Sequence, residues 1–126
     1  MRVLRVEELL VYQKAQSAAA EIFAITARPE FDDDWELRRQ LRAASGRIPS
    51  HIAEGFGQKT DRHFAHYLYI ARGTSQEIRS HLTLARDRGY ITQLECSSKS
   101  ETYDEIARML TGLIKHLDKE DRPHRG

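Results

Sequence analysis

Residues 37–57 read LRRQLRAASGRIPSHIAEGFG and predict the helix around which the fold is built. Apolar residues recur there at spacings of four, three, four and four, at Leu37, Leu41, Ala44, Ile48 and Ile52. At 100° per residue, these positions share one arc of an α-helix. The other side carries four arginines, Arg38, Arg39, Arg42 and Arg47. We therefore expect an amphipathic helix with a buried apolar face and a basic exposed face.

Pro49 and Gly55 predict the shape of this helix. Pro49 has no N–H to donate to the Ser45 carbonyl, and its ring disfavours a helical Ile48, so we expect a bend there that does not end the helix. Gly55 is expected to end the helix with a positive φ, and Phe56 to fold back onto the preceding turn.

The same stretch, with residues 64–77 (FAHYLYIARGTSQE), resembles the four-helix-bundle proteins encoded in intervening sequences of bacterial 23S ribosomal RNA genes. The family pattern, L-x-x-Q-L-R-R-A-A-x-S-I-P-S-N-I-A-E-G, aligns without a gap onto Leu37 to Gly55. Its most specific matches are Gln40, Leu41, Arg42, Ala44, Ile48, Pro49, Ser50, Ile52, Ala53, Glu54 and Gly55. The chain departs from the pattern at Ala43, Ser45, Arg47 and His51.

This resemblance covers nearly the whole chain and implies an antiparallel, up-down four-helix bundle that assembles as a ring of five. The fold is also similar to the accessory subunit of diversity-generating retroelements, which works beside a reverse transcriptase and its RNA. The family carries no known enzymatic activity. The resemblance therefore implies an adaptor with an RNA or a reverse-transcriptase-like protein as partner.

Length and composition favour a single all-α domain. A chain of 126 residues with 40% hydrophobic content buries one core, and its three prolines and seven glycines are few. Twenty basic and nineteen acidic residues give a net charge of +1, so any RNA contact must come from a local patch. Cys96 is the only cysteine, and no apolar run is long enough for a signal peptide or a membrane span. We expect a cytoplasmic protein without a membrane partner.

Three further helices are predicted from heptad-like periodicity. Residues 7–27 carry a seam from Val11 to Ile25, and residues 60–88 carry the most regular seam, from Phe64 to Ala85. A last helix, with a seam that ends at Leu117, begins at a capping box of Thr92 and Glu95 or, alternatively, of Ser98 and Glu101. Residues 119–126 are expected to form a frayed tail.

Two loops are expected to set helix ends. Gly89 and Tyr90 repeat the glycine–aromatic stop. The other loop is the acidic stretch 30–34. Its Asp33 and the following Glu36 have the spacing of a capping box. A divalent-cation site at residues 32–34 is disfavoured, because three consecutive carboxylates diverge.

Candidate binding residues fall into three groups. The arginine face is expected to bind RNA phosphates, or to form ion pairs with residues 30–34 at an interface. A polar interface stripe consists of Gln40, His51 and Glu54, and Glu54 is also a candidate partner of Arg47. The aromatic residues that exceed one seam per helix are candidate oligomer contacts, namely Tyr12, Phe23, Tyr67 and Tyr69.

The sequence gives little support for a catalytic site or a metal site. His51 beside Glu54 lacks a nucleophile or a second carboxylate, and His63 with His66 lacks further zinc ligands at a suitable spacing. We predict no catalytic residue, metal or cofactor. The leading hypothesis is a non-enzymatic, pentameric adaptor that associates with RNA through the arginine face. The alternative is a purely protein-binding scaffold, and a third hypothesis is an enzyme with its site in the central channel of a ring.

Overall fold

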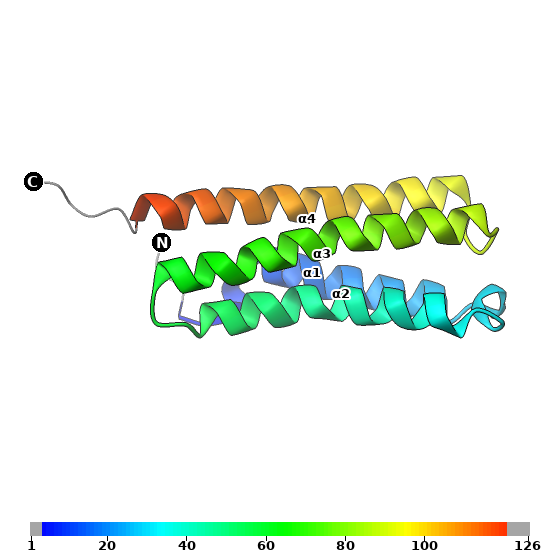
Figure 1. Cartoon of the computed structure of the whole chain (residues 1–126), viewed down its shortest axis with the longest axis horizontal. Coiled ribbons are helices and arrows are strands. Elements are labelled where there is room, and N and C mark those ends of the chain that lie inside the picture. Colours follow the sequence, from blue (N-terminus) through cyan, green and yellow to red (C-terminus); the bar gives the residue numbers. More distant parts are fainter. Residues whose placement is uncertain (1–3, 121–126) are drawn as a thin grey trace, which may run out of the picture.

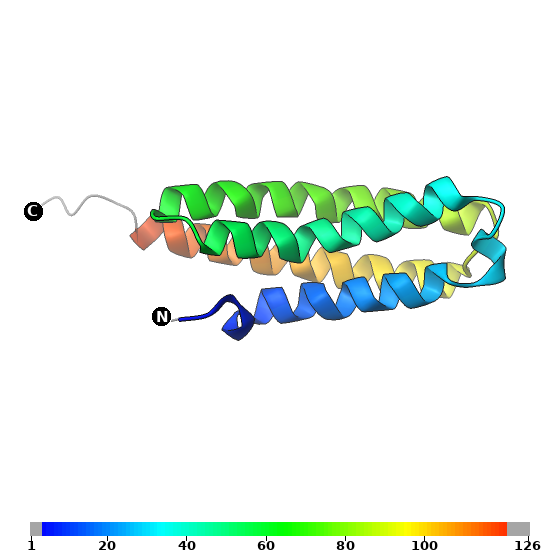
Figure 2. The same ribbon diagram turned by 90° about the horizontal axis from the view of Figure 1, so that it is seen from below.

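The structure is a computed structural model that describes residues 4–120. Its four long helices are α1 (Leu10–Thr26), α2 (Trp35–Phe56), α3 (Asp61–Asp87) and α4 (Gln93–Glu120). They run antiparallel along one long axis, as Figures 1 and 2 show, and α1 also packs against α4. Short 3-10 helices, η1 (Val6–Glu8) and η2 (Pro29–Phe31), precede α1 and α2. The predicted all-α, up-down four-helix bundle is confirmed.

The predicted seams form the core. All five apolar residues of the α2 arc are buried, and so are the seam residues of α3 from Leu68 to Ala85. Phe64, at the start of the α3 seam, is only half-buried and packs against the edge of the core. The largest side chains in the core include Phe31 of η2 and Tyr103 of α4. The core therefore extends from the helices into the connection between α1 and α2.

α2 continues through Pro49, which is buried, and ends at Phe56. The predicted bend at Ile48 stays a prediction. The expected role of Gly55 is wrong, because Gly89 is the only residue with a positive φ in the described chain. Gly55 is a buried helical residue, and a Cβ atom on it would lie 2.7 Å from Tyr67 Cβ and 2.9 Å from Phe64 Cδ1. A glycine is needed there because α3 packs against the α2 backbone.

Gly89 has the role that was predicted for it. Its φ is 79°, a value that glycine adopts without steric strain. The N–H of Tyr90 donates to the Ala85 carbonyl at 2.9 Å, and the N–H of Gly89 donates to the Arg86 carbonyl at 2.9 Å. These two bonds form a Schellman motif, which satisfies carbonyls that the last turn of α3 leaves open.

The N-termini of α2 and α4 are both capped by side chains. The box of Thr92 and Glu95 is confirmed, since each side chain bonds the other residue's backbone N–H, at 3.1 and 2.9 Å. The box expected at Asp33 is wrong by one position, because Asp34 is the N-cap and accepts from the N–H of Leu37. With three consecutive aspartates, the local sequence does not determine which of them is the N-cap of α2. Tertiary contacts of Asp34 explain which of them caps the helix.

Those tertiary contacts join the two connections that lie at the same end of the bundle in Figure 1. Asp34 accepts from Arg88 at 2.7 Å and from the Tyr90 hydroxyl at 2.9 Å. Arg28, in the α1–α2 connection, donates to Glu95 Oε1 at 3.0 Å. We call this set, Arg28, Asp34, Arg88, Tyr90 and Glu95, the interloop contact. Each capping acid therefore also holds the opposite connection.

The interloop contact lowers the pKa of both acids. Hydrogen bonds from Arg28 and from the Thr92 backbone lower the pKa of Glu95 to about 2. For Asp34, desolvation raises the pKa, but bonds from Leu37, Tyr90 and Arg88 together outweigh it and lower the pKa below its ordinary value. Both carboxylates are therefore held in the charged form.

The predicted tail begins later than expected, because residues 119 and 120 still belong to α4. Residues 121–126, on which the rest of that prediction falls, lie outside the described part of the chain.

Candidate functional site

An exposed surface at one end of α1 and α2 combines aromatic and arginine side chains. Phe23 and Trp35 are 59% and 63% exposed. The guanidinium of Arg42 lies 3.8 Å from the Phe23 ring centroid, and that of Arg39 lies 5.8 Å from the Trp35 ring. Trp35 and the arginines, with Ala43, line a hollow of about 480 Å³. We call Phe23, Trp35, Arg38, Arg39 and Arg42 the arginine–aromatic surface.

Arg38 and Arg42 use their guanidinium groups to hold the C-terminus of α1. Arg38 Nε donates to the Thr26 carbonyl at 2.8 Å, and Arg42 Nη2 donates to the Phe23 carbonyl at 3.2 Å. Arg42 Nε also donates to the Thr26 hydroxyl at 2.9 Å. Both carbonyls belong to the last turn of α1, where the Phe23 carbonyl also accepts from the Thr26 hydroxyl at 3.1 Å, and a cation at a helix C-terminus is electrostatically favourable. These two arginines therefore stabilise the fold.

The predicted basic face is also partly neutralised by acids. Arg38 pairs with Asp32 at 2.8 Å, within the acidic loop that was expected to provide such partners. Arg39 pairs with Glu36 at 2.9 Å, and Arg47 pairs with Glu77 of α3 at 3.0 Å. The suggested partner of Arg47, Glu54, is wrong because Glu77 faces it from the neighbouring helix. The four arginines thus do not form one row of free charges.

The polar stripe does not converge on a site. Gln40 donates to Glu36 at 3.0 Å, while Glu54 is exposed. His51 is half-buried beside Tyr67, with ring centroids 6.4 Å apart, and its Nδ1 atom has no hydrogen-bond partner among the described residues. No hydrogen bond joins the side chain of any of the three to a serine, threonine, cysteine or tyrosine side chain in the described part of the chain.

The four predicted oligomer contacts differ in their exposure. Tyr12 and Tyr67 are half-buried, and Tyr12 accepts a hydrogen bond from Gln16 at 2.8 Å. Phe23 and Tyr69 are exposed, on α1 and α3 respectively. The largest exposed aromatic residue, Trp35, was not predicted from the sequence. It directly follows three aspartates at the start of α2, so no apolar periodicity marks it.

Residues 4–120 contain neither a cluster of metal ligands nor a membrane-spanning helix. No group of three or more His, Cys, Asp or Glu side chains in this range is arranged to hold a metal ion. The Nδ1 atom of His63 lies 3.1 Å from the hydroxyl of Thr60, the N-cap of α3. None of the helices described is both long and apolar enough to cross a membrane.

The fold and its surfaces define a class of protein, an all-α antiparallel four-helix bundle whose α2 carries the LRRQLRAASGRIPSHIAEG stretch. The chain belongs to the 23S rRNA-intervening sequence protein family, whose model matches residues 7–112. The resemblance inferred from α2 and α3 is thereby confirmed. No match was found among curated proteins.

A solved structure supports the same fold. The chain is similar to a crystal structure of a protein with unknown function from the S23 ribosomal protein family of Bacteroides thetaiotaomicron. The TM-score is 0.75 at 22% sequence identity, over 84% of this chain and 99% of that chain. At this identity the likeness bears on the fold alone.

Proposed function

We propose that the protein is a non-enzymatic, homo-oligomeric adaptor that binds a macromolecular partner through the arginine–aromatic surface. The observation that carries the proposal is the exposure of Trp35 and Phe23 beside stacked arginines. Aromatic residues and arginine are enriched at protein interfaces and dominate their binding energy. Covering these rings with a partner would remove apolar surface from water, which is favourable.

A protein is the partner class that the local charges favour. Arg38 pairs with Asp32 and Arg39 with Glu36, so Arg42 is the one arginine of this surface without a carboxylate partner among the described residues, and little positive charge is left to attract a polyanion. Two of the three also hold α1 carbonyls, which limits their movement towards phosphate. A protein partner needs only the aromatic rings and the outer edges of these guanidinium groups.

RNA is the second candidate, and one observation favours it. The paired aromatic rings and guanidinium groups are the planar elements on which unpaired bases stack. Among the described residues Arg39 pairs only with exposed Glu36 on the same helix, and such a pair contributes little. This arginine is therefore able to exchange its partner for a phosphate.

Self-association is supported by exposed apolar residues on several helices. Leu10 of α1 is 70% exposed, Leu84 of α3 is 39% exposed and Leu94 of α4 is 79% exposed. A head-to-tail ring needs two different patches on each subunit, and exposed apolar residues on different helices are consistent with that requirement. For the pentamer implied by the family, light scattering should give about five times the 14.6 kDa of one chain. A monomer mass across micromolar concentrations would exclude the ring.

A pull-down from the native host tests the partner. Tagged wild-type protein is compared with Trp35→Ala and Arg39→Gln, each with and without nuclease, and Arg62→Gln on α3 is the matched control. Nuclease-resistant recovery that Trp35→Ala abolishes supports a protein partner. Nuclease-sensitive recovery that Arg39→Gln weakens supports RNA. If both variants recover what wild type recovers, the arginine–aromatic surface is not the binding site.

A further inference from the structure

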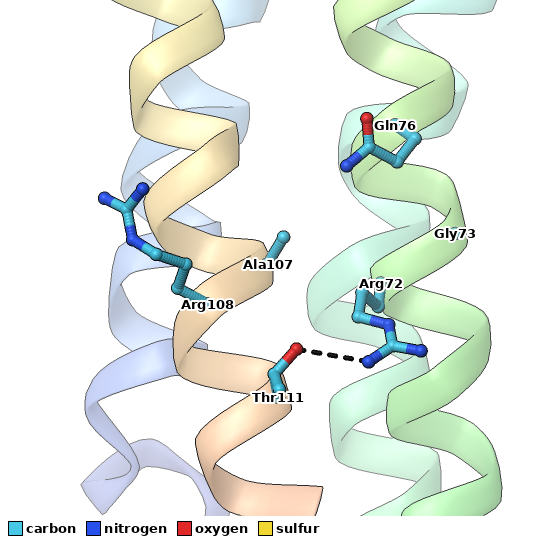
Figure 3. Close-up of a pocket in the computed structure, with 6 residues that line it drawn as sticks. All are labelled: Arg72, Gly73, Gln76, Ala107, Arg108 and Thr111. Carbon is cyan, nitrogen blue, oxygen red and sulfur yellow. Dashed lines mark hydrogen bonds between the residues drawn. The ribbon is translucent and has the colours of Figure 1, made fainter.

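A second surface lies between α3 and α4, on helices other than those of the arginine–aromatic surface (Figure 3). It is a hollow of about 330 Å³, which we call the α3–α4 groove. Its lining residues are Arg72, Gly73, Gln76, Ala107, Arg108 and Thr111. In Figure 3 the Arg72 side chain reaches across the groove to the Thr111 hydroxyl.

The wall of the groove contains a glycine that the bundle does not need. Gly73 is exposed near the middle of α3, and a Cβ atom on it would have no heavy atom within 4 Å. Glycine destabilises a helix interior relative to alanine, and no internal packing here offsets that loss. Gly55, in contrast, is required by the approach of α3. Together with Ala107 beside it, Gly73 leaves room for another backbone to approach closely.

The rim of the groove carries positive charge that is not neutralised. Arg72 donates to Thr111 Oγ1 at 3.1 Å and lies 4.8 Å from the Tyr69 ring, but it pairs with no carboxylate of residues 4–120. Arg79 and Arg108 both pair with the single carboxylate of Asp104. Arg79 lies outside the lining, so the groove itself presents two arginines, Arg72 and Arg108, and only Arg108 has a carboxylate partner among the described residues. No lining residue is acidic, so the groove has a surplus of positive charge beside small residues.

We propose that the α3–α4 groove binds an acidic amphipathic helix of a partner protein. A groove between two antiparallel helices accepts a third helix, whose apolar or small residues pack over Gly73 and Ala107. Carboxylates on its flanks pair with Arg72 and Arg108. The glycine and alanine favour a helix over RNA, because phosphates and bases gain little from small apolar side chains. This proposal does not depend on the partner of the arginine–aromatic surface.

The probe is a displayed library of helical peptides in which the outward-facing positions are randomised. Peptides that bind the full chain are selected from it. We expect the selected peptides to be enriched in Asp and Glu. Arg72→Glu and Gly73→Gln should each weaken their binding at least about tenfold, the first by charge reversal and the second by filling the groove. Gly46→Gln is the matched control, because Gly46 is also an exposed helical glycine, and a Cβ atom on it would have no neighbour within 4 Å. It should leave binding unchanged.

Thermal melts of the variants separate lost binding from lost folding. The Cβ atom of neither substitution would meet a neighbouring heavy atom, and glutamine favours a helix more than glycine does, so both variants should melt at or above the wild-type temperature. The proposal is overturned if no peptide is selected, if the selected peptides are not acidic, or if Arg72→Glu and Gly73→Gln bind them as wild type does. It is also overturned if a 20-nucleotide oligouridine binds in a manner that Gly73→Gln abolishes, because the groove then binds RNA.

Discussion

Gly55 allows α2 and α3 to pack closely, and we expect Gly55→Ala to destabilise the protein. The added Cβ would lie 2.7 Å from Tyr67 Cβ, 2.9 Å from Phe64 Cδ1 and 3.2 Å from the Phe64 carbonyl oxygen. Carbon atoms attract best at about 3.5–4.0 Å, so the two helices would have to separate by roughly 1 Å. The close neighbours include a backbone atom and a Cβ, which a change of rotamer cannot move.

The expected magnitude is the difference between two effects. Overpacking of this kind costs about 1–3 kcal/mol, whereas replacing a helical glycine by alanine gains about 1 kcal/mol. Because the clash involves backbone, we expect the cost to lie in the upper part of this range, about 2–3 kcal/mol, and the free energy of unfolding to fall by about 1–2 kcal/mol. Urea unfolding followed by circular dichroism, at fixed protein concentration, measures it.

Gly73→Ala is the control for this prediction. Its Cβ would meet no heavy atom within 4 Å, so it should raise the free energy of unfolding by about 0.5–1 kcal/mol. If Gly55→Ala proves as stable as Gly73→Ala, the inferred close contact between α2 and α3 is wrong.

Three further predictions concern the helix ends and Pro49. The folded pKa of Glu95, about 2, lies below its ordinary value of 4.5, so its contribution to stability is present above pH 4.5 and lost as pH falls towards 2. Wild type should therefore lose more stability than Glu95→Gln over that range in acid titrations, and parallel losses would contradict the role of Arg28. Arg42→Gln should lower the free energy of unfolding by about 1–2 kcal/mol by removing the bonds at the end of α1, whereas Arg39→Gln should change it by less than about 0.5 kcal/mol. Equal effects in urea unfolding would show that Arg42 does not hold α1. Pro49→Ala should straighten α2 at Ile48, and superimposed crystal structures with the same helix axis would show that the proline causes no bend.

The periodic apolar residues allowed the fold to be predicted from sequence. Apolar residues spaced three and four positions apart in α2 and α3 identified the buried residues. In a helix with one face in water, residues at this spacing form the opposite face, which packs into the core. Gly89 and the box of Thr92 and Glu95 were also predictable, because their contacts are local. Asp34 was not, because three adjacent aspartates offer equivalent caps and Arg88 and Tyr90 come from far along the chain.

The candidate surfaces were harder to predict than the fold. The positions of Arg38 and Arg42 on α2 were read correctly as outside the core, but their contacts with the end of α1 depend on how the helices pack. Gly55 was read as a local stop signal, whereas its role comes from Tyr67 and Phe64 of α3. The pairing of Arg47 with Glu77 is likewise a contact between helices. Sequence spacing within one helix contains no information on such neighbours.

The interloop contact has a consequence for the order in which the protein folds. Its three hydrogen-bonded pairs are separated by 54, 56 and 67 positions in the sequence. The contact can therefore form only after the α1–α2 hairpin has met the α3–α4 hairpin. We expect this meeting to follow the transition state, in which case loss of the contact raises the unfolding rate and leaves the folding rate nearly unchanged. The contact would therefore act as a kinetic lock on the finished bundle, and its weakening in acid would shorten the lifetime of the native state without slowing its formation.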